Sequence, residues 1–111
     1  MNSADVSKLV ASEIASAGDD WFEDPRNNPH RLDMAHCLVP PTRVTCTNVL
    51  PGEREERFDV WLVLAELPGN DDGYQIVFEE EANKFGLACG TRESPVLVGL
   101  YGSFLETVQS M

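Results

Sequence analysis

The run FDVWLVLAEL, from Phe58 to Leu67, constrains the fold more than any other part of this sequence. Its even and odd positions are both largely apolar, so neither face of the strand that it predicts is suited to water. We therefore expect this strand to lie centrally in a sheet, with both faces covered. A chain of 111 residues can bury one hydrophobic core but is too short for two. We expect one domain over residues 1–111, without a linker.

Shorter stretches with a period of two predict further strands around this central one. The expected strands span residues 35–39, 43–50, 58–67, 74–78, 85–89 and 96–100. The Pro40-Pro41 pair is expected to end the first of them, because proline cannot donate to a strand ladder. Segments 51–57 and 79–83, both rich in glutamate, are expected to be turns.

A helix is expected at the start of the chain. Residues 4–17 carry apolar side chains every three or four positions, which predicts a helix with one apolar face. Asn2 or Ser3 can cap the start of this helix through a side-chain oxygen. Gly18 suits the left-handed backbone that commonly follows a helix end.

A second helix is expected at the C-terminus, where Ser103 and Glu106 match the capping box, in which each side chain satisfies the other residue's backbone amide. A run of strands between two helices predicts an α+β fold. We expect a single two-layer domain, with helices packed on one face of a mostly antiparallel sheet of about five to six strands.

The segment 18–33, GDDWFEDPRNNPHRLD, has no apolar period and is expected to be a long ordered loop. A loop of this length in a small domain either carries function or is pinned to the core. Trp21 and Phe22 suit both roles, because a large aromatic side chain can anchor the loop inside or contact a partner outside. The sequence leaves these two roles open.

The charge balance argues against several classes of function. The chain has 8 basic and 19 acidic residues, which gives a formal net charge of −11. Its negative field repels nucleic acids and anionic membranes, because proteins bind both of these through clusters of lysine and arginine. A partner with a basic surface is instead attracted. The same charge also serves solubility alone, and composition does not separate these two explanations.

The cysteines and the apolar runs bear on where the protein works. Three cysteines, at positions 37, 46 and 89, cannot form a closed disulfide framework without a leftover thiol. The chain opens without a signal-peptide pattern, and its longest apolar run, from Val60 to Ala65, is far too short to span a membrane. These observations predict a reduced, cytoplasmic protein without membrane contact.

No motif for metal binding, cofactor binding or nucleophilic catalysis stands out. The cysteines include no Cys-x-x-Cys pair, and His36 and Cys37 would point to opposite faces of the expected strand. The glycines lack the spacing and the basic neighbours of a phosphate-binding loop. We therefore expect no metal site, no cofactor and no catalytic residue, and we expect the cysteines to be structural.

Two acids of the central strand need a partner or a role. Glu66 is expected to point inward, and Asp59 to lie on the same face as Trp61. A carboxyl group enclosed in a pocket would suit acid–base catalysis. The preferred interpretation is that these acids pair with arginines across the sheet, namely Arg43, Arg54 or Arg57.

The remaining acids gather in four groups, all at expected loops or turns. These groups lie within residues 19–24, 53–56, 71–72 and 79–81. Aromatic side chains inside a ring of acids suit an interface with a basic protein. The residues predicted to contact such a partner are Asp19, Asp20, Trp21, Phe22, Glu23, Asp24, Asp71 and Asp72.

The sequence therefore predicts a small acidic protein-binding module. Its size and charge suit an inhibitor or immunity-type partner of a basic protein, such as a nuclease or another nucleic-acid-binding protein. One alternative is a small enzyme or ligand-binding domain with a pocket between sheet and helices, using Glu66, His36 or Tyr101. Another is a homodimeric structural protein that associates through one face of the strand that carries Trp61.

Overall fold

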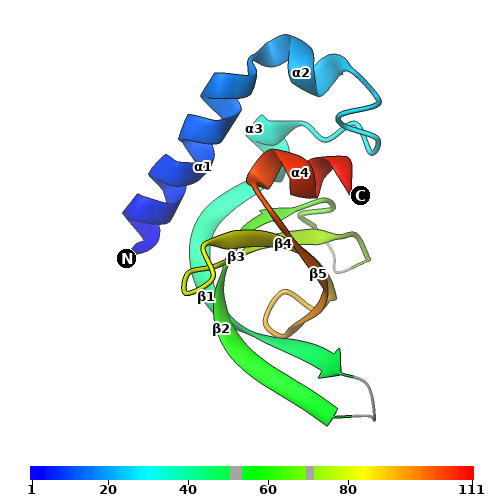
Figure 1. The fold of residues 1–111 in the computed structure, drawn as a ribbon. Coiled ribbons are helices and arrows are strands. Elements are labelled where there is room, and N and C mark those ends of the chain that lie inside the picture. The colour runs from blue at the N-terminus through cyan, green and yellow to red at the C-terminus, as the bar shows by residue number, and fades with distance from the viewer. Residues whose placement is uncertain (51–53, 70–71) are drawn as a thin grey trace.

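Within the described residues of the computed structural model, which are 1–50, 54–69 and 72–111, five strands form a closed barrel beside four helices (Figure 1). The predicted α+β class, the N-terminal helix and the short C-terminal helix are confirmed. In chain order the elements are α1 (Ser3–Ala17), α2 (Asp19–Glu23), α3 (Met34–Cys37), β1 (Leu38–Leu50), β2 (Arg54–Ala65), β3 (Gln75–Glu79), β4 (Lys84–Gly90), β5 (Pro95–Gly102) and α4 (Phe104–Gln109).

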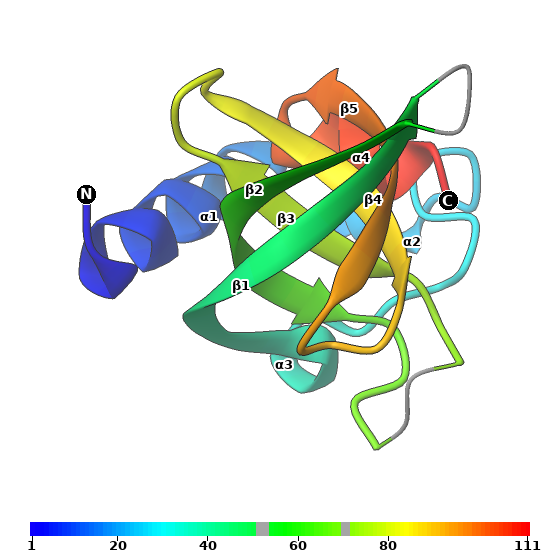
Figure 2. The same cartoon turned by 90° about the horizontal axis from the view of Figure 1, so that it is seen from below.

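The strands pair in chain order, and the last strand returns to the first. All consecutive pairs are antiparallel, whereas β5 closes the barrel on β1 with a parallel contact between Thr47 and Val96. Figure 2 shows the strands arranged around the barrel, with β1 and β2 running its full length. The expected two-layer sheet is thus refined to a barrel. Irregular pairing in β1–β2 and β2–β3 increases the local bend that closure requires.

Strand β2 is buried on both faces, as its sequence predicts. Val60 and Leu62 point into the barrel interior, and Trp61 and Val63 lie on the outer face, under the helices. The interior cluster consists of Cys46, Val60, Leu62, Val77 and Ala88. The larger outer cluster includes Val6 and Val10 of α1, Phe104 and Val108 of α4, and Ile76, Phe78 and Phe85 of the sheet.

The helix ends use the predicted capping residues. Ser103 forms a single side-chain bond in place of the expected reciprocal capping box, and Gly18 has a ψ of 165° rather than a left-handed helical conformation. Asn2 and Asp5 form a reciprocal capping box at the start of α1, and Gly18 follows its end with a φ of +80°. Ser103 accepts a hydrogen bond of 3.0 Å from the Glu106 amide at the start of α4. The Phe104 amide at the same helix start donates to a carboxylate oxygen of Glu13 at 3.0 Å, which ties α4 to α1.

The strand expected over 35–39 is wrong in its first half. Residues 34–37 form the single turn α3, because the Asp33 side chain caps it by accepting a hydrogen bond of 3.1 Å from the Ala35 amide. Strand β1 begins only at Leu38 and continues through the Pro40-Pro41 pair that was expected to end it. These prolines fall where the β1–β2 register shifts, between Leu38 and Thr42, so their missing amides interrupt no regular ladder.

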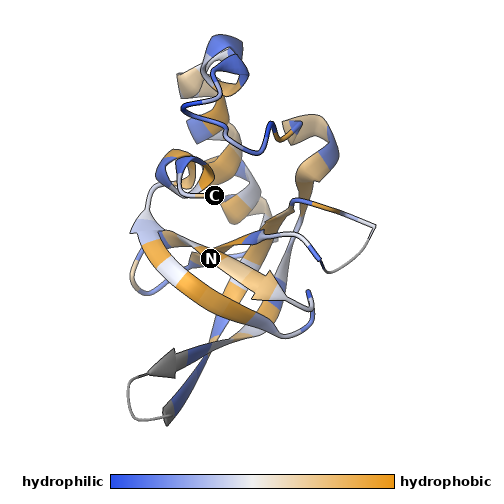
Figure 3. Ribbon diagram, turned by 90° about the vertical axis from the view of Figure 1, so that its right-hand side faces the viewer, coloured by the Kyte–Doolittle hydropathy of each residue, from blue (hydrophilic) through white to orange (hydrophobic). Residues whose placement is uncertain are grey.

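Two segments expected to be irregular contain regular structure. Within 18–33, residues 19–23 form the helical turn α2. Within the expected turn 51–57, residues 54–57 already belong to β2, and 51–53 lie outside the described residues. The turn expected at 79–83 is confirmed after β3. Figure 3 shows hydrophilic residues concentrated near α2 and toward the far end of the β1–β2 hairpin, with hydrophobic residues along the strands between them.

Gly86 of β4 tests how tightly β4 and β5 are packed. A Cβ atom at this position would lie 2.8 Å from the Gly99 carbonyl oxygen and 2.8 Å from a Leu100 methyl carbon. We expect Gly86→Ala to lower the free energy of unfolding by about 1–3 kcal/mol, as overpacking does in other cores. Chemical denaturation followed by circular dichroism measures it.

Gly69→Ala is the matched control, because nothing lies within 4 Å of the Cβ it would add. This control is expected to change stability by less than about 0.5 kcal/mol, the usual range for surface positions. Equal effects of the two substitutions would show that β4 and β5 are not in this close contact.

Candidate functional site

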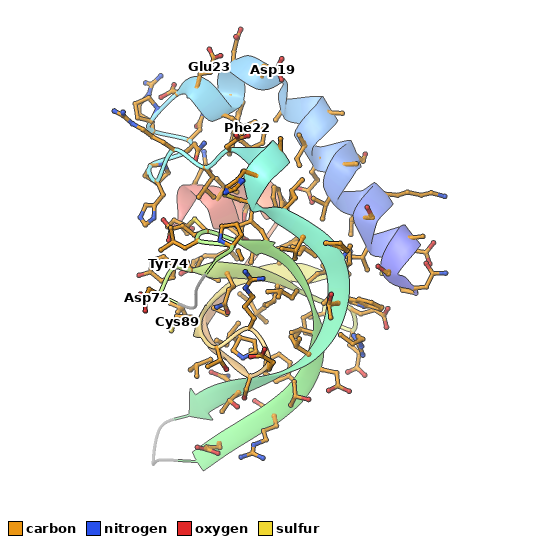
Figure 4. The ribbon with its side chains drawn as sticks, turned by 180° about the vertical axis from the view of Figure 1, so that it is seen from behind. Asp19, Phe22, Glu23, Asp72, Tyr74 and Cys89 are labelled. Atoms are coloured by element: carbon orange, nitrogen blue, oxygen red, sulfur yellow. The ribbon has the colours of Figure 1, made fainter. Side chains whose placement is uncertain are left out.

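The segment between α1 and α3 builds a hollow of about 420 Å³ beside the end of α1. Its lining consists of Ile14, Asp19, Phe22, Glu23, Leu32, Asp33, Met34 and Ala35. We call it the α2 hollow. This lining combines apolar side chains with the three acids Asp19, Glu23 and Asp33. Figure 4 shows Asp19 and Glu23 on the outer side of α2 and Phe22 on the side nearer the barrel.

Asn28 holds this segment in shape from the inside. Its side chain is 2% exposed, and its amide nitrogen donates to the carbonyl oxygens of Phe22 and Leu32, each at 3.0 Å. Its amide oxygen accepts from the Leu32 amide at 2.9 Å. Three hydrogen bonds from one buried side chain replace the regular ladder that the segment lacks. Sequence reasoning missed this residue, because the sequence does not distinguish a buried asparagine from an exposed one within a polar loop.

The two aromatic residues of α2 divide the roles that the sequence left open. Trp21 packs against the outer core cluster, with its ring edge-on to Phe22 at 4.8 Å between centroids. Phe22 lines the α2 hollow and also a neighbouring hollow of about 310 Å³. Trp21 therefore anchors the turn, and Phe22 is the aromatic side chain that both hollows share. Contact of either with a partner stays a prediction.

Asp24 is engaged within its own segment. Arg26 donates to its carboxylate from the backbone amide at 2.9 Å and from the guanidinium at 2.7 Å. These hydrogen bonds lower the pKa of Asp24 from the ordinary 3.8 to about 2. Because Arg26 offsets this charge, the negative field of α2 comes mainly from Asp19, Asp20 and Glu23.

His30 joins this segment to the connection between β2 and β3. Its Nδ1 atom contacts a carboxylate oxygen of Glu66, and the other oxygen of Glu66 accepts from the Tyr74 amide at 3.0 Å. The His30 and Tyr74 rings lie 5.8 Å apart. Asp72 is exposed two residues before Tyr74 (Figure 4), and Asp71 lies outside the described residues. The structure thus connects the two segments predicted to contact a partner.

The expected acid–arginine pairs across the sheet are replaced by other contacts. Glu66 is paired with His30, while Asp59 accepts a hydrogen bond of 3.0 Å from the Thr45 hydroxyl. The Arg43 guanidinium lies over the Trp61 ring, 5.1 Å from its centroid. Asp59 does share the Trp61 face, as predicted. The sequence does not fix the register between two strands. A shift of one residue in that register changes which side chains face each other across the sheet.

The residues of the enzyme alternative lie on separate elements. Glu66 follows β2, His36 is exposed on α3, and Tyr101 is 38% exposed on β5. The histidine that contacts Glu66 is His30, which sequence reasoning did not select. A histidine among prolines and asparagines gives no local signal for a contact 36 positions away.

The three cysteines carry free thiols. Cys37 and Cys46 are buried, and burial raises the pKa of both, that of Cys46 to about 11. A raised pKa disfavours the thiolate that metal binding and nucleophilic attack require. Among the residues that the structure describes, no group of three or more histidine, cysteine or acidic side chains is placed to hold a metal ion.

Comparison with known proteins adds no relative to this description. The chain matches no protein-family model, no curated protein and no solved structure. None of the helices in the described ranges has the length and apolar character needed to cross a membrane.

The Asp24–Arg26 pair predicts a dependence of the segment on pH. A carboxyl group whose pKa is lowered on folding adds stability at pH above its unfolded value of 3.8, and this contribution is lost as pH falls toward about 2. NMR of the Asp24 side-chain carbon should therefore give a titration midpoint near 2, and Arg26→Gln should return it toward 3.8. A wild-type midpoint near 3.8 would contradict this pairing.

Proposed function

We propose that this chain is a small acidic module that binds a protein with a basic surface. The observation that supports the proposal is the α2 hollow, in which Ile14, Phe22, Leu32 and Met34 provide apolar surface beside three carboxylates. An apolar hollow bordered by several carboxylates suits an apolar side chain of a partner that is flanked by lysine or arginine. The net charge of −11 steers such a partner toward the molecule.

The partner that fits this chemistry best is a nuclease or another nucleic-acid-binding protein. Such proteins present lysine and arginine arrays for phosphates, and carboxylates spaced over α2 can occupy those arrays in place of nucleic acid. The finer proposal is therefore an inhibitor or immunity-type protein that acts in the cytoplasm. Neither nucleic acid nor an anionic membrane is proposed as a direct ligand, because both carry charge of the same sign.

A second candidate function rests on the contact between His30 and Glu66. A carboxylate that holds Nδ1 of a histidine orients the imidazole and leaves its other nitrogen for proton transfer. This contact favours the alternative of a small enzyme or ligand-binding domain, with His30 in place of His36. Retained partner binding in a His30→Ala variant would place this contact outside the partner-binding surface, and loss of a ligand-induced shift of the Tyr74 amide in the same variant would support the alternative.

Self-association is a third candidate, at a different surface from the one predicted. Trp61 is only 9% exposed, so its strand face is already covered. Several exposed apolar residues lie together on β5 instead, with Val96 39% and Val98 53% exposed. Light scattering over a range of concentrations would reveal a dimer formed through them.

The binding proposal predicts the effect of reversing two charges at the α2 hollow. We expect Asp19→Lys combined with Glu23→Lys to reduce recovery of a basic partner from a lysate of the source organism by about tenfold, since rim charges govern steering and orientation. Wild type and variant are compared at low and high salt, and recovered proteins are identified by mass spectrometry. Recovery by the wild type should fall as salt screens the charges.

Glu55→Lys combined with Glu93→Lys is the matched control, because it makes the same change in net charge at exposed positions outside the α2 segment. This control should retain most of the recovery, and circular dichroism should show both variants folded. Equal loss of partner recovery in the two variants would show that net charge alone causes the effect. Unchanged recovery with the α2 variant would remove this hollow from the interface.

A further inference from the structure

A second hollow, of about 250 Å³, lies at the end of the barrel where the β1–β2 hairpin extends. Its lining consists of Asn48, Glu56, Phe58, Glu79, Glu81, Leu97 and Leu100. We call it the barrel-mouth hollow. It shares no residue with the α2 hollow, so what is inferred for it does not rest on the proposed function.

The hollow exists because β2 is longer than its neighbour β3. β3 pairs with β2 only between Trp61 and Ala65, whereas β1 accompanies β2 back to Arg54. Phe58 therefore lies beyond the last β3 pair, where the barrel interior opens. Phe58 and Leu97 pack against the interior cluster while staying partly exposed, and Leu100 is 39% exposed. These three side chains form an apolar surface that water reaches.

Carboxylates from two separate acidic groups of the sequence meet at this hollow. Glu56 comes from the β1–β2 hairpin, and Glu79 and Glu81 come from the end of β3 and the turn after it. The Glu79 carboxylate accepts hydrogen bonds from the amides of Glu81 at 3.2 Å and Ala82 at 2.6 Å, which orders this turn. The acids are thus held beside the apolar surface by the fold.

The acidic surface continues into an adjoining hollow of about 290 Å³. Its lining consists of Arg43, Phe58, Asp59, Glu79, Glu80 and Glu81, so four carboxylates face one guanidinium. That guanidinium already lies over the Trp61 ring. Phe58 lines both hollows, so acidic side chains lie near it in each of them.

We infer that the barrel-mouth hollow binds an arginine side chain from an extended segment of a partner protein. The alkyl part of arginine can lie on Leu97 and Leu100, and its planar guanidinium can stack on Phe58 while it donates to Glu56 and Glu81. The volume suits one long side chain and lies below the usual range for drug-sized ligands or cofactors.

The test is an NMR titration of the ¹⁵N-labelled protein with the peptide acetyl-Gly-Arg-Gly-amide, which carries the arginine but no apolar anchor for the α2 hollow. The backbone amides of Phe58, Leu97 and Leu100 should shift and saturate, while those of Phe22 and Glu23 in the α2 hollow stay unchanged. The peptide with citrulline in place of arginine removes the charge and keeps the shape. It should bind about tenfold more weakly, since charge-assisted hydrogen bonds are roughly twice as strong as neutral ones.

Substitutions locate the effect within the hollow. Glu56→Gln combined with Glu81→Gln should weaken arginine-peptide binding about fivefold, the range expected for two partly exposed ion pairs. Glu55→Gln combined with Glu93→Gln makes the same change in net charge outside the hollow and should alter binding less than about twofold. Leu100→Ala should weaken binding of both peptides, and Val98→Ala, which alters no lining residue, should weaken it less.

Three results would overturn the inference. Shifts spread over all acidic segments, or equal losses in the two glutamine pairs, would show non-specific attraction. Absence of saturating shifts at Phe58 and Leu100 would show that the hollow takes no arginine. Butylguanidinium binding as tightly as the arginine peptide would assign the hollow to a small organic cation rather than to a protein segment. Because α2 amides are followed in the same spectra, a failure at the barrel-mouth hollow is distinguished from a failure at the α2 hollow.

Discussion

The structure depends on the double burial of strand β2. A strand that is apolar on both faces loses the stabilisation from burial unless each face is covered. Here the barrel interior covers Val60 and Leu62, and the helices cover Trp61 and Val63. Closing the sheet into a barrel meets the first requirement, and packing α1 and α4 on the outside meets the second. The rest of the chain is arranged around these two apolar layers.

This arrangement determines where the charges go. The strand centres are occupied mainly by apolar side chains, and the acids that border the two hollows lie at strand ends, in a turn and in the segment between α1 and α3. Carboxylates from three of the acidic groups lie at two surfaces, Asp19 and Glu23 at the α2 hollow and Glu56, Glu79 and Glu81 at the barrel mouth. At each surface the carboxylates border an apolar hollow. Both proposals draw on that combination, because carboxylates alone only attract a cation, whereas apolar surface beside them can select its shape.

Local signals in the sequence predicted local structure well. The apolar period predicted α1, the capping pattern predicted α4, and the apolar residues at both even and odd positions predicted that both faces of β2 are covered, although in a closed barrel no strand is central. Each of these patterns involves residues that lie close together in the sequence. Strand ends were less accurate, because Asp33 caps a helical turn at α3 and the Pro40-Pro41 pair sits at a bulge where it is tolerated.

Features that depend on long-range contacts were not predictable from the sequence. Barrel closure rests on a parallel contact between Thr47 and Val96, and alternation of side chains is the same in an open sheet and in a closed one. The burial of Asn28 and the contact between His30 and Glu66 bring together residues without a shared local pattern. The acidic groups were visible in the sequence, but their apolar neighbours, such as Leu100 beside Glu56, come from other strands.

The most direct test of the doubly covered strand is a methyl NOE measurement on the folded protein. The Val60 and Leu62 methyl groups should show cross-peaks to Val77 and Ala88, and the Val63 methyl groups should show cross-peaks to Val6 and Val10 of α1. The two sets should not exchange cross-peaks with each other's partners. If either set instead showed contacts only to water, one face of β2 would be uncovered, and the closed barrel beneath its helices would be wrong.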